Sequence, residues 1–317
     1  PDVLRVFLFL FAMGVLLHWQ SCASSDAKKE EVTHIQTGDP TIDALTKQIA
    51  DNPEKADVWF QRARAFRQQE AFDQAISDMN QAMNRDSTKL EYYHFLTDVF
   101  LDYFRSKKAL QTITKASKIQ PDHIPTLLKL AETYMIVEQY GAAEKVTKDI
   151  LEIDPAHSET LFLRGLIFEQ KEENQKAVDN YLGAAEIDPE NTDAWINLGK
   201  MLSATQDPRA AQYFQNAIQV DSSNLEAWLG LGNHHFNMEE YEKAVEIFDK
   251  MHFLNAQYPH SYFNKGLLYL ETGEPEKAWL AFDMTLEVDV MYVKAYYYRG
   301  LASEQMGDLK AAKGDYM

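Results

Sequence analysis

Residues 158–191, SETLFLRGLIFEQKEENQKAVDNYLGAAEIDPEN, form a 34-residue unit whose pattern recurs along most of the chain. Apolar residues recur in it at spacings of three and four, which is typical of helices, and Pro189 ends the pattern. Steps of 34, with one step of 33 before Ala210, lead from Ala177 to the alanines 75, 109, 143, 210, 244, 278 and 312. A period of about 20–50 residues is typical of repeat arrays, so we predict eight copies of one unit.

Two further positions keep the same phase. A bulky residue stands about sixteen positions before each alanine, and a mostly small residue stands four positions after the bulky one. The bulky residues are Trp59, Tyr93, Leu127, Leu161, Trp195, Trp228, Tyr262 and Tyr296. The small position holds Ala63, Thr97, Ala131, Gly165, Gly199, Gly232, Gly266 and Gly300. We therefore expect each unit to be two antiparallel helices that approach closely at the small residue.

This pattern resembles the tetratricopeptide repeat (TPR), most clearly at Trp195, Gly199, Ala210, Phe214 and Ala217. The resemblance implies an all-α fold, a right-handed superhelical solenoid of about eight helix-turn-helix repeats. The repeats are expected near residues 56–89, 90–123, 124–157, 158–191, 192–224, 225–258, 259–292 and 293–317. A single helical bundle is the alternative, but a bundle has no reason to repeat its turns in register.

The ends of the array also carry expectations. The fifth repeat is one residue short around Asp207–Pro208, which we expect to change a crossing angle without erasing the repeat. Residues 41–55 are expected to form a capping helix and turn before the first repeat. Because the sequence opens on Pro1 and ends inside the second helix of repeat eight, we expect the natural chain to be longer and repeat eight to be truncated.

The first 22 residues differ in kind from the repeats. Val6–Leu17 is an uninterrupted apolar stretch preceded by Arg5. As a helix it would rise about 18 Å, too short for a hydrocarbon core of about 30 Å. It therefore predicts a signal peptide over residues 1–22. The polar residues 23–40 are predicted to be a flexible tether.

Cys22 is the only cysteine in the chain and ends this leader. Its position after Ser21 resembles a bacterial lipoprotein signal, which implies a lipid anchor such as palmitate on Cys22. The implied location is the outer membrane of a bacterial cell envelope, because Ala23 is not the aspartate that retains many lipoproteins at the inner membrane. The alternative is ordinary signal-peptide cleavage after Ala23, which would leave a periplasmic protein.

The composition argues against two classes of function. Lys and Arg total 31 against 49 Asp and Glu, a net charge of −18 that would repel nucleic-acid phosphates. We find no Lys/Arg cluster with interleaved aromatic residues, and so predict no nucleic-acid partner. No metal, nucleotide or nucleophile motif is present, so we predict no enzyme activity, metal or cofactor. His235 occupies a position that is aromatic in other repeats and is expected to pack in the core.

Binding of a protein or peptide partner remains as the predicted function. Stacked repeats form an extended concave face, which in TPR arrays is lined by the first helix of each repeat. The groove residues expected from this placement are Phe60, Arg64, His94, Leu128, Phe162, Lys200, Leu229, Asn233, Phe236, Phe263, Leu267, Leu270, Tyr297 and Leu301. Their apolar character toward the C-terminal half suits an amphipathic helix or an extended peptide.

Three functions stay open from the sequence. The first is a membrane-tethered scaffold in a bacterial envelope. The second is the docking or regulatory half of a longer enzyme. The third is a soluble periplasmic chaperone that binds peptides.

Overall fold

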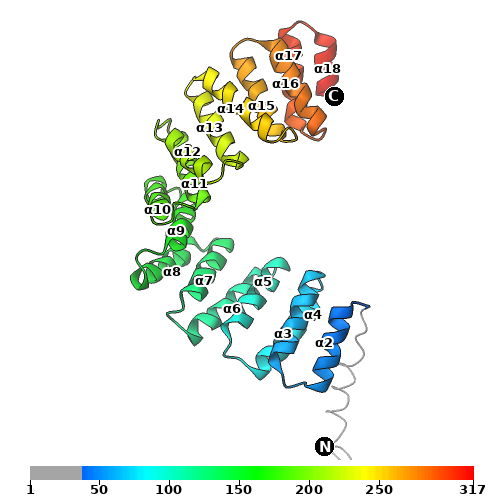
Figure 1. Cartoon of the computed structure of the whole chain (residues 1–317), viewed down its shortest axis with the longest axis vertical. Helices are drawn as coiled ribbons and strands as arrows, with labels where there is room; N and C mark the ends of the chain where they lie inside the picture. Colours follow the sequence, from blue (N-terminus) through cyan, green and yellow to red (C-terminus); the bar gives the residue numbers. More distant parts are fainter. Residues whose placement is uncertain (1–37) are drawn as a thin grey trace, which may run out of the picture. The chain divides into compact units, whose positions relative to one another are not determined.

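The computed structural model describes residues 38–317. This part holds 17 helices, α2 to α18, and no strand, so the predicted all-helical repeat fold is confirmed (Figure 1). The helices form two compact units. The first ends at Ile119 and the second begins at Gln120. The predicted signal peptide, Cys22 and the tether up to residue 37 lie outside the described residues. Within residues 38–317 no helix combines the length and apolar character needed to cross a bilayer.

Within residues 38–119, the first unit holds one single helix and two helix pairs. Its helices are α2 (Pro40–Asp51), α3 (Ala56–Gln68), α4 (Phe72–Arg85), α5 (Leu90–Asp102) and α6 (Ser106–Ile119). Helix α2 packs on α3 and begins at the sequence Asp39–Pro40. The Asp39 carboxylate accepts hydrogen bonds from the backbone N–H groups of Thr41 (2.8 Å) and Ile42 (3.0 Å). Pro40 takes the first helical position, where its missing N–H costs nothing.

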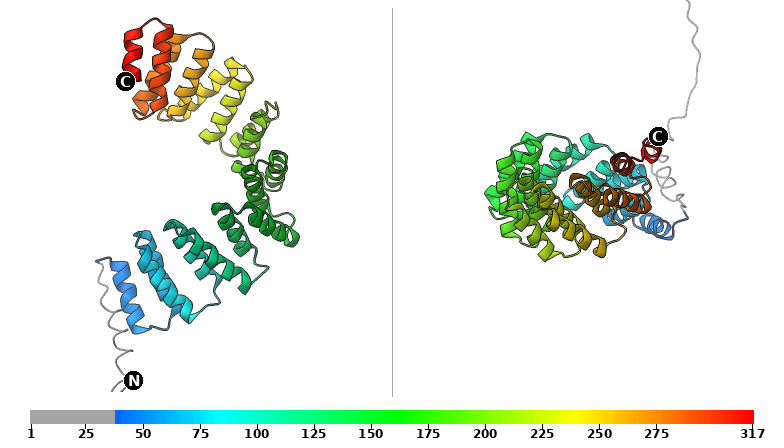
Figure 2. Two further views of the ribbon diagram at one scale, coloured as in Figure 1. Left: turned by 180° about the vertical axis from the view of Figure 1, so that it is seen from behind. Right: turned by 90° about the horizontal axis from the view of Figure 1, so that it is seen from above.

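The second unit holds six helix pairs, which lie side by side in sequence order (Figures 1 and 2). The first three pairs are α7 (Ile124–Ile136) with α8 (Tyr140–Ile153), α9 (Ser158–Gln170) with α10 (Asn174–Ile187), and α11 (Thr192–Ser203) with α12 (Ala210–Val220). The last three pairs are α13 (Leu225–Asn237) with α14 (Tyr241–Leu254), α15 (Pro259–Glu271) with α16 (Pro275–Val288), and α17 (Val293–Gln305) with α18 (Leu309–Tyr316).

The turn inside every pair has the same backbone conformation. One residue, 14 positions after the start of the first helix, has a positive φ between 55° and 84°. These residues are Glu70, Phe104, Glu138, Glu172, Gln206, Glu239, Gly273 and Gly307. The next N–H group donates to a carbonyl five residues back, as from Ala71 to Phe66 (2.9 Å) and from Asp308 to Ser303 (2.8 Å). This is the Schellman motif, which satisfies the last carbonyls of the first helix.

Close helix contact occurs at the small position, as predicted. A Cβ atom added to Gly165 would lie 2.5 Å from the Tyr181 ring, and one added to Gly232 would lie 2.6 Å from the Phe248 ring. The glycines at 199, 266 and 300 meet rings of the second helix in the same way. Each glycine thus makes room for one aromatic ring inside its own repeat.

The bulky position has a second role besides packing. The indole N–H of Trp59 donates to the carbonyl of Pro53 (2.8 Å), and that of Trp195 donates to the carbonyl of Pro189 (3.0 Å). Trp228, Tyr93 and Tyr262 also donate to the carbonyl six residues earlier. These hydrogen bonds fix the turn that leads into each repeat, because the donor is held by helix packing.

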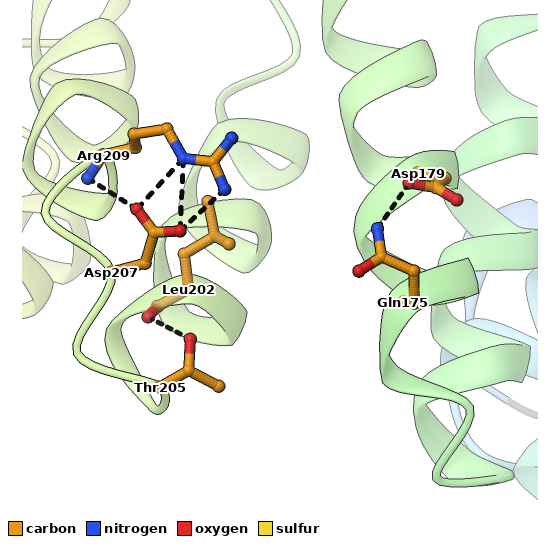
Figure 3. A network of polar contacts seen from close by, with 6 residues as sticks. All are labelled: Gln175, Asp179, Leu202, Thr205, Asp207 and Arg209. Atoms are coloured by element: carbon orange, nitrogen blue, oxygen red, sulfur yellow. Dashed lines mark hydrogen bonds and ion pairs between the residues drawn. The ribbon is translucent and has the colours of Figure 1, made fainter.

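The fifth repeat is one residue shorter than the others, and the missing residue falls where the first turn of the second helix would be. Three residues, rather than four, separate the positive-φ residue Gln206 from Ala210. Helix α12 consequently begins only at Ala210, and Asp207 holds the turn before it (Figure 3). Its carboxylate accepts from the backbone N–H (2.9 Å) and the guanidinium (2.6 Å) of Arg209. Together these contacts lower the pKa of Asp207 to about 2.

The two units differ strongly in charge. Residues 38–119 contain twelve Asp and Glu and twelve Lys and Arg, a net charge of zero. Residues 120–317 contain 33 Asp and Glu and 16 Lys and Arg, a net charge of −17. Almost the whole net charge of −18 therefore belongs to the second unit.

Candidate functional site

A pocket of about 410 Å³ opens between the first helices of two successive repeats in the second unit. We call it the α11–α13 pocket. Helix α11 contributes Lys200 and Ser203, followed by Ala204, and helix α13 contributes Glu226, Leu229, Gly230, Asn233 and Asn237. Phe214 of α12 also lines it. Pockets lined by apolar groups with a few polar ones are typical of binding sites.

The floor of the pocket depends on a glycine outside the regular small position. Gly230 lies against the Phe214 ring, and a Cβ atom added there would come within 2.2 Å of it. Gly199 lies against the same ring, and a Cβ atom added to it would be 2.9 Å away. Two glycines of successive first helices thus make room for one ring of the second helix. The result is an apolar floor at the junction of the fifth and sixth repeats.

The rim of the pocket is polar and nearly neutral. The Lys200 ammonium contacts the Glu226 carboxylate at 2.5 Å, so the two charges compensate each other. The Ser203 hydroxyl lies 3.1 Å from Nδ1 of the buried His234. Burial, and to a smaller extent the neighbouring His235, lower the pKa of His234. Since Asn233 and Asn237 offer amide donors and acceptors, the rim suits the backbone of a peptide.

Three predicted groove residues meet in this pocket: Lys200, Leu229 and Asn233. Arg64 lies elsewhere, in a cavity of about 680 Å³ in the first unit that Arg67, Phe72, Phe95 and Phe104 also line. Arg67 is already paired there with Asp102 at 2.7 Å.

Three other predicted groove residues are buried, and their expected exposure to a partner was wrong. Phe60 is 7% exposed and packs on Tyr92 and Phe95, with ring centroids 5.0 and 5.2 Å away. Phe263 is 6% exposed and Leu128 is 7% exposed. For Phe60 and Phe263 the physical reason is that aromatic rings of neighbouring residues pack against the side chain. Phe263, for example, lies within 4.9–5.6 Å of the rings of Phe282, Tyr292 and Tyr298.

The remaining predicted groove residues are not fully buried, but they do not line the α11–α13 pocket either. Tyr297 is 56% exposed and lies beside Tyr298 and Tyr316. The half-buried residues are His94, Phe162, Phe236, Leu267, Leu270 and Leu301. The structure does not bring these residues into the α11–α13 pocket.

Sequence reasoning missed six of the nine residues that line the pocket, namely Ser203, Ala204, Phe214, Glu226, Gly230 and Asn237. For Gly230 the sequence does contain a signal. The equivalent position in other repeats holds a larger residue, for example Gln61, Leu163 or Tyr298. Phe214 was named only as a residue of the repeat pattern, and it is 1% exposed. No sequence pattern showed that its edge would form the floor of a pocket.

Sequence comparison agrees with the repeat geometry. Tetratricopeptide repeat models match residues 56–89, 158–191 and 208–260. The chain is a tetratricopeptide repeat protein. In this TPR protein, helix pairs α3–α4 and α9–α10 fall inside the first two matched segments. The TPR fold supports a role as a protein-interaction scaffold.

Two curated relatives are 25% identical to this TPR protein. They are anaphase-promoting complex subunit 7 of Dictyostelium discoideum, over 48% of the chain, and subunit 3 of Schizosaccharomyces pombe, over 55% of the chain. The alignment covers 26% of each relative, so the chain spans about a quarter of their length.

Two solved structures share the fold. A tetratricopeptide repeat protein from Parabacteroides merdae is 17% identical, with a TM-score of 0.56 over 78% of this chain and 99% of the other. PilW, a type IV pilus biogenesis factor, is 20% identical, with a TM-score of 0.53 over 62% of this chain and 90% of the other. At these identities the likeness concerns the fold alone.

His235 packs as expected, at 9% exposure, with its Nδ1 against the Glu240 carboxylate. Among residues 38–317, no group of three His, Cys, Asp or Glu side chains is placed to hold a metal ion.

Proposed function

We propose that this TPR protein is a scaffold of a bacterial cell envelope that holds a partner peptide in the α11–α13 pocket. The observation that carries the proposal is the meeting of Lys200, Leu229 and Asn233 from two repeats over the Phe214–Gly230 floor. An apolar side chain of the partner occupies the floor, while Asn233 and Asn237 bind its backbone. The partner contributes no strong charge here, because Lys200 and Glu226 already neutralise each other.

Membrane attachment is the second part of the proposal. Cys22 follows an apolar stretch of twelve residues and lies some 18 residues before α2, so a lipid on its thiol would leave the array free to meet partners. The relatives support the scaffold role in a general way, because both are named as subunits of a multiprotein complex.

Site-specific photocrosslinking tests the pocket. A benzoylphenylalanine at Leu229 is expected to crosslink a partner in the native host, because this residue lines the pocket. The matched control carries the same group at Gln215, which is exposed on α12 and lies outside the pocket. Equal products from both positions would place the binding surface elsewhere. With Asn233→Ala, we expect the crosslinked yield from position 229 to fall several-fold.

Metabolic labelling tests the anchor separately. Cells fed labelled palmitate are expected to label the wild-type protein and not a Cys22→Ala variant. An unlabelled wild-type protein would refute the lipoprotein assignment and favour the periplasmic alternative, without bearing on the pocket.

A further inference from the structure

Helix α6 of the first unit has a cationic outer face. Its charged residues are Lys107, Lys108, Lys115 and Lys118, all four are exposed, and the helix contains no Asp or Glu. At about 100° per residue these lysines fall within an arc of about 100°. The opposite side of the helix is formed by the buried residues Ala109, Thr112, Ile113 and Ala116.

These lysines are not neutralised by neighbouring carboxylates. Among residues 38–317, none of the four has a carboxylate oxygen within 4.0 Å of its ammonium group. The corresponding helix of the next repeat differs, because α8 interleaves Lys145 and Lys148 with acidic residues, and Lys148 contacts Glu152 at 3.4 Å. The charge on α6 is therefore available to a partner.

An exposed aromatic residue lies in the turn before α6. Phe104 is 96% exposed and has the positive φ of this turn, 55°, two residues before α6 begins at Ser106. It also lines the first-unit cavity that contains Arg64. Four of the other repeats place glutamate at this position. Tyr103 beside it is covered by the Arg105 guanidinium, 3.9 Å from its ring centroid, and leaves Phe104 as the accessible ring. We call Phe104 and the four lysines the α6 surface.

This lysine cluster, in which no aromatic residue is interleaved, was not predicted from the sequence. The charge of the whole chain concealed it, because the second unit carries −17.

We propose that the α6 surface docks on an anionic lipid bilayer. Lysines near such a surface each strengthen binding about fivefold, and an adjacent aromatic side chain can enter the headgroup region. The charge complementarity is local, since the acidic second unit is repelled by the same lipids. A single-stranded nucleic acid fits less well, because its successive bases require several stacking rings. The proposal does not depend on acylation of Cys22.

Vesicle co-sedimentation of the full chain tests the proposal. A Cys22→Ser variant removes any lipid anchor, and the vesicles are phosphatidylcholine with or without about one-third phosphatidylglycerol. We expect binding only to the anionic vesicles, weakened by salt. Lys107→Glu with Lys108→Glu is expected to weaken binding more than tenfold. Lys145→Glu with Lys148→Glu on α8 makes the same change in net charge and is expected to alter binding less than twofold.

Phe104 gives an independent readout. Phe104→Asn removes the ring and introduces a residue that tolerates positive φ. It is expected to weaken vesicle binding about threefold and to leave the circular dichroism spectrum unchanged. Phe104→Trp is expected to add blue-shifted fluorescence when anionic vesicles are present.

Four results would overturn the proposal. The first two are an equal loss of vesicle binding in the α6 and α8 lysine-pair variants, and equal binding to vesicles with and without phosphatidylglycerol. The third is tighter binding to a single-stranded oligonucleotide than to anionic vesicles. The fourth is a dimer, seen by light scattering, that Lys107→Glu with Lys108→Glu abolishes. The last would assign the α6 surface to the acidic unit of a second copy.

Discussion

Two positions in each repeat restrict which residue they accept. At one the available volume is the restriction, and at the other it is the backbone conformation. At the glycine position a side chain is excluded by the ring of the facing helix. At the positive-φ position the backbone is fixed, and the side chain points into open surroundings when it is as exposed as Phe104. Substitutions at the two positions should therefore act in opposite directions.

Gly232→Ala is expected to destabilise the protein by about 1–2 kcal/mol. The added methyl would lie 2.6 Å from the Phe248 ring, which is buried and cannot move away without strain. Urea unfolding measures the change. Gly183→Ala in α10 is the control, because its Cβ meets only Leu161 at 3.5 Å, and it should stabilise by about 0.5–1 kcal/mol through helix propensity. Equal effects of both substitutions would contradict the steric explanation.

Glu138→Gly is expected to stabilise the protein by about 0.5–1 kcal/mol. Glu138 has φ 60°, which strains an L-residue, whereas the equivalent residues 273 and 307 are already glycine. Glu186→Gly, at an exposed position inside α10, should destabilise by about 1 kcal/mol. Thermal unfolding distinguishes the two, and a loss of stability at position 138 would show that the turn depends on the glutamate side chain.

At the scale of elements, charged residues link helices at a position that is otherwise leucine. Arg62 of α3 is 2% exposed and makes two hydrogen bonds, of 2.7 and 2.8 Å, to the Asp78 carboxylate of α4. It also donates to Thr46 of α2 (2.9 Å), and so joins three helices. Arg299 of α17 pairs in the same way with Asp315, again 16 residues later.

Arg164 occupies the equivalent position in α9 but lacks this partner. Its Nε atom is buried without a hydrogen bond, and the residue 16 positions later is Asn180. We expect Asn180→Asp to supply the missing carboxylate and to stabilise the protein by about 1 kcal/mol. Chemical denaturation of Asn180→Asp with and without Arg164→Met checks this, since the gain should vanish once the guanidinium is removed. A gain that persists would have another origin.

The helices could be predicted from the sequence because the same pattern of bulky, small and alanine positions recurs in every repeat. The turn within each repeat also falls 14 residues after the start of its first helix. The ion pairs could not be, since Arg62 and Asp78 look like surface residues until their helices face each other. The site was predicted in part for a related reason. Periodicity identifies the helix face of Leu229 and Asn233, but side-chain size at neighbouring positions decides whether Phe263 is accessible or buried.

The whole molecule distributes its charge unevenly, and its stability should reflect this. The second unit, at −17, is destabilised by its own repulsion. Raising the ionic strength from about 0.1 M to about 1 M shortens the Debye length from about 10 Å to about 3 Å. We therefore expect the urea midpoint to rise with NaCl. In Glu242→Gln with Glu246→Gln, an exposed pair one helical turn apart on α14, this rise should be smaller. A midpoint independent of salt would contradict the explanation.

The positive-φ turns have a practical consequence. Because the backbone and not the side chain closes each turn, residues 70, 104, 138, 172, 206, 239, 273 and 307 form a series of addressable sites, one in every repeat. A fluorophore, an affinity tag or a grafted loop at these positions would leave the helix contacts untouched, except at position 206, where the Gln206 amide donates to the Asn237 carbonyl of α13. The array can thus be labelled repeat by repeat, which would allow the opening of individual repeats to be followed one at a time.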